Sequence, residues 1–476
     1  MPPVSSHLAG PIARTAEAVA SRRISAESAV DEALRRIGER DASLAAVVEL
    51  RSEQALAEAR ALDRRLDTGE QTPGPLCGVP LLVKDLEDVA GMVTRKGSLL
   101  LADANPAVAD DACVARLRQA GAIVVGKSNL PEFATEGFTD NLLYGATHNP
   151  WNPALSPGGS SGGSAAALAS GMVPLATATD GGGSVRIPAA FCGLLGLKPT
   201  HGRVGRRPTA DWLDFSTEGP LATEAADLRL VDSILAGMTL GDPDSAPGTA
   251  GDLQPVQRLF AAQRTSDLGP LDPELAGLFD DAVAAMAELL GLQVEWLEPG
   301  TLFAGAGDPD LDWFVAATAE HVAALGRSYV GENLDRMHPA TQTFMRDGLS
   351  VDIDSYLAAR RRRFEQARRV DELLDGAGLL LTPTVAATAW TTDGRLPGQE
   401  SSDMLPPAAY STAMQNVTGH PALSLPAGIS AIGLPFGLQV TATRWRDADL
   451  LNLAEAWQAA HPWAVTAPGY DPFDAG

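Results

Sequence analysis

The chain has 476 residues, of which 45% are hydrophobic, enough for two or three ordinary domains or for one large α/β domain with a substantial core. Its formal net charge of −24 at pH 7 argues against nucleic acid or an anionic membrane surface as a partner. The three cysteines form no CxxC pair and the seven histidines show neither HxH nor HxxxH spacing, so the sequence predicts no metal site.

The sequence also favours one cellular compartment. The first ten residues, MPPVSSHLAG, lack the basic and apolar regions of a secretory signal, and no run of about 18 apolar residues could span a bilayer. Three cysteines leave at least one thiol unpaired, which fits a reducing environment. We therefore expect a cytoplasmic protein.

The first sixty residues are predicted to be helical. Ser25 is a suitable N-cap, Glu27 lies in the first turn, and apolar residues recur at helical spacing from Val30 to Ile37. From about residue 75 the pattern changes to short apolar runs that alternate with helices. Leu81–Val83 is a buried-strand candidate, and it precedes the run Lys84-Asp85.

The same alternation continues along the chain. A helix over 111–120, stopped by Gly121, is followed by the strand candidate AIVVG. Asp272 caps a helix through Leu290, and the strand candidate LQVEWL follows it. A long helix over about 354–374 leads into the apolar stretch LLLTP. Helices alternating with strands predict an α/β fold with a mostly parallel sheet.

Two segments are predicted to be irregular, about 239–255 and about 391–407, and the second is expected to be a surface loop near a site. The basic run Arg360–Arg363 could suggest anion binding. Because it lies in a helix rich in Asp and Glu, a solvated helix face is the favoured interpretation.

The stretch PGGSSGGSAAALASG, Pro157 to Gly171, resembles a flexible linker at first. However, GGSSGG runs directly into a strong helix former, and a linker needs no such neighbour. A phosphate loop would need Lys-Ser/Thr after the last glycine, which is absent. The GxSxG pattern around Ser161 leaves open an α/β-hydrolase-type esterase, although the preceding WNPALSP is turn-rich rather than a strand.

A second cluster, TDGGGSVRIPAAFCG, begins at Thr179. Three consecutive glycines let backbone N–H groups converge on one point, as an oxyanion hole requires. Ser184 follows them and is placed to attack a carbonyl, but it needs a base. Lys84, at the end of a buried strand, could be desolvated enough to be neutral, although taken alone a surface lysine is the more common case.

Three stretches together resemble the amidase signature family: GVPLLVKDLEDVAGMVTRKGS, PGGSSGGSAAALASG and TDGGGSVRIPAAFCGLLGLKPTHGRV. The resemblance extends to AGAIVVGKSNLPEFA, YGATHNPWNP and QNVTGHPALSLPAGISAIGLPFGLQV, and so covers most of the chain from about residue 10. It implies a catalytic triad of Ser184, Ser160 and Lys84, with a cis peptide before Ser160.

The resemblance also implies roles for the neighbours of the triad. The oxyanion hole would comprise the N–H groups of Gly181, Gly182, Gly183 and Ser184. Supporting roles fall to Ser161, which would orient Lys84 or the loop, and to Asp180 and Arg186, which would brace the glycine loop. Cys192 is expected to be packed structure rather than a nucleophile.

The implied fold is a single large α/β domain with a mixed central sheet sandwiched by helices. A helical segment, 1–66, would pack on an amidase signature domain, 67–476, whose motifs are densest over 75–205. The variable region, about 205–410, would shape the substrate pocket. Its aromatic and apolar candidates, most of them expected to be core, are Trp212, Leu213, Phe215, Trp313, Phe314 and Tyr356.

The implied activity is hydrolysis of a small acyl or aryl amide, with carbamates and esters as further substrates. No cofactor is implied, and a homodimer is expected. The A-type subunit of a tRNA-dependent amidotransferase is the alternative within the family.

Overall fold

The computed structural model describes residues 10–70, 72–246, 255–266, 271–397 and 411–476. The helices are α1 (Pro11–Ala20), α2 (Ala26–Arg40), α3 (Ser52–Asp67), α4 (Ala112–Gln119), α5 (Gly162–Ala169), α6 (Arg186–Cys192), α7 (Ala225–Leu235), α8 (Pro273–Leu290), α9 (Pro309–Leu325), α10 (Arg327–Asn333), α11 (Pro339–Ser350), α12 (Ile353–Leu374), α13 (Ala413–Thr418) and α14 (Asp447–Ala460). The strands are β1 (Val47–Leu50), β2 (Pro80–Lys84), β3 (Ile123–Ser128), β4 (Leu175–Ala176), β5 (Thr179–Asp180), β6 (Leu195–Lys198), β7 (Thr217–Glu218), β8 (Leu221–Ala222), β9 (Arg258–Ala261), β10 (Val294–Trp296), β11 (Gly378–Pro383), β12 (Ala422–Ile429) and β13 (Pro435–Ala442).

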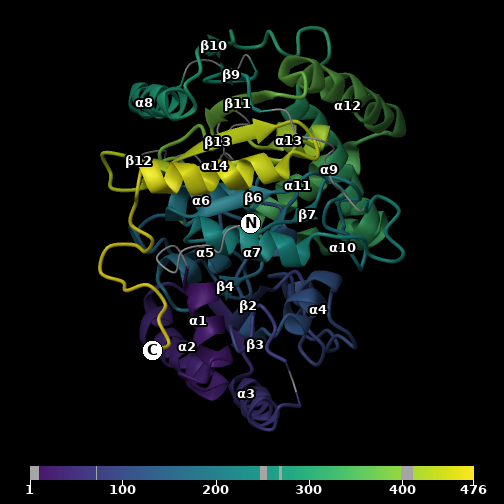
Figure 1. The fold of residues 1–476 in the computed structure, drawn as a ribbon. Coiled ribbons are helices and arrows are strands. Elements are labelled where there is room, and N and C mark those ends of the chain that lie inside the picture. The colour runs from purple at the N-terminus through teal and green to yellow at the C-terminus, as the bar shows by residue number, and fades with distance from the viewer. Residues whose placement is uncertain (1–9, 71, 247–254, 267–270, 398–410) are drawn as a thin grey trace.

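Within the described residues, the larger sheet has seven strands in the order β10-β9-β11-β13-β12-β6-β8 (Figure 1). Only the β10–β9 and β9–β11 pairs are parallel, and the remaining neighbours are antiparallel. The larger sheet is therefore mixed, and for this sheet the prediction of a mostly parallel arrangement is wrong. The spacing of apolar residues identifies strands but not which strands pair or in which direction. Hairpins such as β12–β13 make neighbouring strands antiparallel.

Helices cover both faces of this sheet, because alternate strand residues point to opposite sides. Leu379 and Leu381 pack with residues of α7, α8 and α14, whereas Leu380 packs with residues of α12 and α13. Helix α6 lies on the second face so closely that a Cβ at Gly437 would be 2.5 Å from the Ala190 Cβ. This is the α/β/α sandwich that the resemblance implied.

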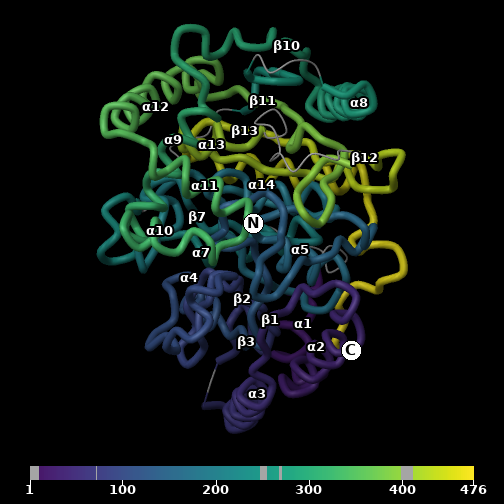
Figure 2. Tube along the Cα trace, turned by 180° about the vertical axis from the view of Figure 1, so that it is seen from behind, coloured from purple at the N-terminus to yellow at the C-terminus, as the bar shows by residue number. Residues whose placement is uncertain are grey.

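A smaller sheet, β1-β3-β2-β4, lies at the other end of the molecule (Figures 1 and 2). One face packs on α2, α3 and α5, and the other on α1, α4 and α7. The C-terminal tail returns to the N-terminal helices, where Arg36 donates to the carbonyls of Pro472 and Asp474 at 2.8 and 3.3 Å. The division into segment 1–66 and domain 67–476 stays a prediction.

Most predicted elements are present at the expected places. Ser25 caps α2 by accepting from the Ser28 N–H at 3.0 Å, and Asp272 caps α8, which ends at Gly291 in the left-handed conformation. Leu81–Val83 and AIVVG lie in β2 and β3, and LLLTP lies in β11.

Two local predictions differ from the structure. Val47–Leu50, within the supposed helical segment, forms strand β1 because it pairs with β3. The predicted solvated face at Arg360–Arg363 holds only in part. Arg361 and Arg362 are exposed, but Arg360 and Arg363 both bind the Asp214 carboxylate, and Arg362 also binds Asp312 on α9. Asp214 and Asp312 lie far from α12 in the sequence, so the helix sequence alone cannot predict these ion pairs. Of the predicted irregular segments, 247–254 and 398–407 lie outside the described residues.

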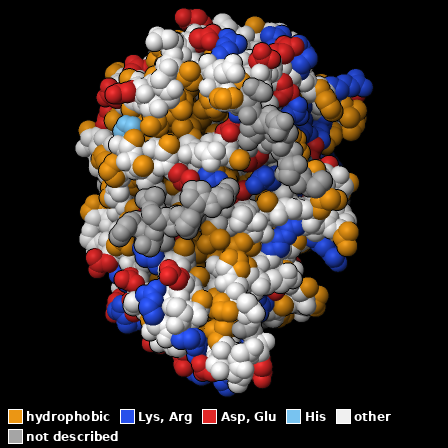
Figure 3. Space-filling model, in the orientation of Figure 1, with side chains coloured by type: hydrophobic (Ala, Val, Ile, Leu, Met, Phe, Trp, Pro, Cys, Tyr) orange, Lys and Arg blue, Asp and Glu red, His pale blue; other side chains and the backbone are white. Residues whose placement is uncertain are grey.

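On the surface, acidic and basic side chains are interspersed on the face in Figure 3, with Asp and Glu near the upper and lower ends. Among the described helices, none is both long and apolar enough to cross a bilayer.

Candidate active site

Lys84 is the last residue of β2, and its side chain is fully buried. Its Nζ donates to Ser160 Oγ at 2.7 Å, to Thr179 Oγ1 at 2.9 Å and to Ser161 Oγ at 3.0 Å. Three hydroxyl oxygens therefore surround the amine, and no carboxylate of the described residues pairs with it directly.

Burial lowers the pKa of Lys84 to about 7, although the charges of Glu87 and Asp180 oppose this shift. Removal from water penalises the ammonium form more than the amine. Near neutral pH a large fraction of Lys84 is thus the neutral amine, which is the form that can accept a proton.

Ser160 and Ser161 precede α5, and the Gly159–Ser160 peptide bond is cis, as expected. Ser160 is buried, yet it lines a cavity together with Ser184. Ser161 is fully buried: it contacts Lys84, and its N–H donates to the Ser184 carbonyl at 3.3 Å. No histidine within the described residues hydrogen-bonds to Ser161, so the α/β-hydrolase-type interpretation lacks its histidine base.

Ser184 lies between the glycine loop and α6. Asp180 holds this loop with both carboxylate oxygens: Oδ1 accepts from the Gly183 N–H at 2.8 Å and Oδ2 from the Val185 N–H at 3.2 Å. Arg186 donates to the same carboxylate at 2.8 and 2.9 Å, and both side chains are fully buried. Asp180 thus contacts the glycine loop and Arg186 contacts Asp180, while their supporting role in catalysis stays a prediction.

Burial alone would raise the pKa of Asp180, but the Arg186 charge and hydrogen bonds lower it to about 2. Asp180 is therefore ionised near neutral pH, and its ion pair with Arg186 keeps both charges there. Arg186 also donates to side-chain oxygens of three residues that the sequence did not single out: Gln415, Asn416 and Gln439. The first two begin the QNVTG stretch, which carried the resemblance without an assigned role.

Two further contacts orient the glycine peptides. Trp313 Nε1 donates to the Gly181 carbonyl at 2.6 Å, and Thr412 Oγ1 donates to the Gly182 carbonyl at 2.6 Å. A trans peptide directs its N–H opposite to its C=O, so these contacts also fix the following amides.

One predicted oxyanion donor must be removed. The Gly183 N–H donates to Asp180 and is not free for a ligand. The amides of Gly181, Gly182 and Ser184 donate to no other described residue. Three amides without a partner in the described part of the chain remain as candidate donors to a developing oxyanion.

Ser184 lines two cavities. The first, here called the apolar cavity, has a volume of about 270 Å³. It is lined by Ala134, Thr135, Glu136, Gly137, Gly182, Ser184, Ile187, Trp212, Asp310, Leu311, Trp313, Phe314, Phe344 and Ala413. Trp212 and Trp313 meet edge to face, with ring centroids 5.7 Å apart.

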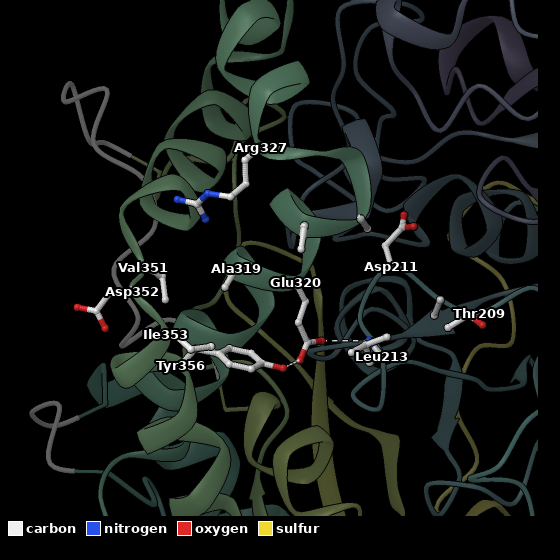
Figure 4. A pocket seen from close by; sticks show the side chains of 13 residues that line it. Thr209, Asp211, Leu213, Ala319, Glu320, Arg327, Val351, Asp352, Ile353 and Tyr356 are labelled. Atoms are coloured by element: carbon white, nitrogen blue, oxygen red, sulfur yellow. Dashed lines mark hydrogen bonds between the residues drawn. The ribbon is translucent and has the colours of Figure 1, made fainter.

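The second, here called the polar cavity, has a volume of about 80 Å³ and also reaches Ser160 and Thr179. Its walls include the carboxyl groups of Glu87, Asp111 and Glu218. Residues 209–211 separate it from a larger cavity of about 670 Å³, here called the outer cavity. In the outer cavity the Tyr356 hydroxyl donates to Glu320, which accepts from the Leu213 N–H (Figure 4).

The six pocket candidates from the variable region thus divide into three groups. Trp212, Trp313 and Phe314 line the apolar cavity, whereas Leu213 and Tyr356 line the outer cavity. Phe215 is core, stacked under the guanidinium groups of two arginines of α12.

The cysteines have structural positions. Cys77, Cys113 and Cys192 are all buried and free, and burial raises the pKa of the Cys192 thiol. Within the described residues, no group of three His, Cys, Asp or Glu side chains could hold a metal ion.

Comparison with known proteins gives one consistent result. The Amidase family matches residues 28–451. An acylamidase of Rhodococcus erythropolis is 34% identical over 95% of this chain and 96% of that protein. The A-type subunit of the glutamyl-tRNA(Gln) amidotransferase of Pseudomonas fluorescens is 33% identical over 96% of this chain and 98% of that protein. The crystal structure of a bacterial aryl acylamidase of the amidase signature enzymes superposes with a TM-score of 0.84 at 29% identity, covering 96% of this chain and 97% of that one.

Proposed function

Because the chain belongs to the amidase signature family of amide hydrolases, we propose that it cleaves the carbon–nitrogen bond of small acyl or aryl amides through an acyl-enzyme on Ser184. One observation carries this proposal. The Nζ of fully buried Lys84 lies 2.7 Å from Ser160 Oγ, and Ser160 and Ser184 line the same cavity.

In the first step neutral Lys84 accepts the proton of Ser160 while Ser160 accepts that of Ser184. Ser184 Oγ bonds to the carbonyl carbon, and the carbonyl π-electron pair moves to the oxygen. The amides of Gly181, Gly182 and Ser184 stabilise the resulting oxyanion.

Collapse of this intermediate breaks the carbon–nitrogen bond. The proton returns from Lys84 through Ser160 to the nitrogen, which leaves as a neutral amine. Water then attacks the Ser184 ester by the same proton relay, releases the carboxylic acid and restores the serine.

The proton relay also assigns the two sides of the substrate. The nitrogen must lie next to Ser160 to receive its proton, so the nitrogen faces the polar cavity, which is too small to enclose a whole aryl amine. The acyl group then occupies the apolar cavity, which Ser184 also lines, against Trp212 and Trp313. Aromatic walls favour acyl or aryl groups of moderate size.

The similarity to an acylamidase and an aryl acylamidase supports such substrates. Carbamates and esters are further proposed substrates, because they present the same carbonyl to Ser184. A component of a tRNA-dependent amidotransferase is the second candidate, favoured by the relative from Pseudomonas fluorescens. The net charge of −24 disfavours it, since a tRNA partner carries a phosphate backbone.

Compartment and assembly are proposals too. The three buried free thiols support a reducing compartment such as the cytoplasm. The homodimer rests on the family resemblance alone and is tested by light scattering of the purified protein.

The test is a panel of 4-nitroanilides, alkyl amides, carbamates, matched esters and glutamine, assayed with the wild type and Ser184→Ala. The variant should lose activity by a factor of roughly 10⁴ or more while keeping its melting temperature. A fluorophosphonate probe should label Ser184. Substantial hydrolysis by Ser184→Ala, or an adduct on Ser161, would contradict the assignment, and hydrolysis of glutamine alone would favour the amidotransferase candidate.

A further inference from the structure

Glu136 is a carboxylic acid in the wall of the apolar cavity, and the mechanism above does not use it. Its residue is 5% exposed, and its buried Oε1 has no hydrogen-bond partner within the described residues. Burial raises the pKa of Glu136 to about 8, with no neighbouring charge to oppose the shift.

A second carboxyl group faces the same cavity from the first turn of α9. Asp310 Oδ1 is buried and also lacks a partner among the described residues. Burial raises the pKa of Asp310 to about 7, assisted by the charge of Asp308 and opposed by the charges of Arg186 and Arg264. No Lys, Arg or His side chain of the described residues lines the apolar cavity.

Unpartnered buried carboxyl groups are costly to a folded protein. A buried carboxyl group without a hydrogen-bond partner in the protein destabilises the fold. A cavity for a purely hydrocarbon acyl group would be better lined by apolar side chains at both positions. A ligand group that carries hydrogen-bond donors into the cavity would partner both carboxyl groups.

We propose that the apolar cavity binds an acyl group that ends in a protonated amine, with the ammonium held by Glu136 and Asp310. This deepens the proposed function and rests on it, because the acyl side of the substrate was assigned from the proton relay. The positive charge of a bound ammonium favours the ionised form of both carboxyl groups, and its three N–H groups can donate to them. Trp313 and Phe314 line the same cavity and offer aromatic rings for cation–π attraction.

The size of the cavity sets the length of such a group. With about 270 Å³, the apolar cavity lies near the lower end of small-molecule sites, at roughly 300 Å³. A 6-aminohexanoyl group, with about eight non-hydrogen atoms, is a ligand of that size class. Heptanoyl has the same length with a methyl group in place of the ammonium.

The experiment compares 6-aminohexanoyl and heptanoyl 4-nitroanilide, which share the leaving group. In the wild type, kcat/KM should be roughly tenfold to a hundredfold higher for the amino substrate, as expected for buried charge-assisted hydrogen bonds. Glu136→Gln and Asp310→Asn should each reduce this ratio at least about fivefold.

Glu288→Gln serves as the matched control, because Glu288 is exposed on α8, does not line the cavity, and undergoes the same change of side chain. Its ratio should equal that of the wild type. A ratio near one in the wild type, or a ratio unchanged in both cavity variants, overturns the proposal. Melting temperatures establish that each variant is folded.

Binding to Ser184→Ala, measured by calorimetry, separates this inference from the proposed function. Tighter binding of the amino substrate, weakened by a second substitution Glu136→Gln, supports the inference even if neither substrate is turned over. Equal or weaker binding of the amino substrate overturns the inference. If the inference fails in this way but the wild-type enzyme hydrolyses both anilides and Ser184→Ala does not, the proposed function still holds.

Discussion

The rate of acylation should rise with pH through an ionisation near 7, because only neutral Lys84 can accept the proton of Ser160. The ordinary pKa of a lysine is 10.5, and burial of Lys84 lowers it to about 7. As pH rises through 7 the neutral fraction grows, so the rate rises and then reaches a plateau above about pH 8.

The size of the effect follows from the two pKa values. At pH 7 about half of the Lys84 side chains are neutral, whereas roughly one in three thousand would be neutral at the ordinary value. Burial thus increases the reactive form roughly a thousandfold. Below pH 6 the rate should fall about tenfold for each pH unit.

The assay is kcat/KM for a 4-nitroanilide from pH 5 to 10 at constant ionic strength, since this parameter reports ionisations of the free enzyme. Glu87→Gln should move the rising limb to lower pH, because the charge of Glu87 raises the pKa of Lys84. Glu218 also lines the polar cavity, and burial raises its pKa to about 7, so Glu218 is an alternative source of the same ionisation. If Lys84 is the source, the rising limb of the pH profile should persist in Glu218→Gln. A midpoint near 10, or a flat profile with acylation rate-limiting, would refute the argument.

Three further predictions concern single substitutions. Lys84→Ala should depress amide hydrolysis about 10²- to 10⁴-fold more than hydrolysis of a matched ester, because a phenolate leaves without a proton; equal losses with acylation rate-limiting would exclude Lys84 as the donor. Arg186→Ala leaves the buried carboxylate of Asp180 without its ion pair and should lower the free energy of unfolding by about 3–5 kcal/mol, which urea denaturation measures; a loss below about 1 kcal/mol would show that the pair is dispensable. Gly182→Ala would place a Cβ 2.5 Å from Cζ2 of Trp313, so the ring must move and kcat/KM should fall; unchanged kinetics would indicate that the ring position is not needed.

Part of this protein can be predicted from short stretches of sequence. Helix α8 is an example: Asp272, Pro273 and Gly291 fix its ends through contacts with residues two to four positions away. The glycine loop before Ser184 is another, since three successive glycines leave the backbone amides without Cβ obstruction.

The partners of these local features come from distant parts of the chain. Thr179 binds the lysine amine across 95 residues, and Gln415 reaches Arg186 across 229. The residue pattern of a single helix or strand cannot predict contacts between residues so far apart in the sequence. The resemblance supplied the triad and the cis peptide, but not these contacts.

The sequence by itself determined the α/β class, because helix caps and apolar spacing are local. The resemblance of long stretches to the amidase signature family supplied the family and the three residues proposed for the chemistry. Only the tertiary structure decided that the Gly183 amide is committed to Asp180, that burial brings the pKa of Lys84 to about 7, and that Glu136 and Asp310 share one cavity. Burial and pairing depend on which segments fold against each other, and that is settled by packing across the whole chain rather than by any one stretch of it.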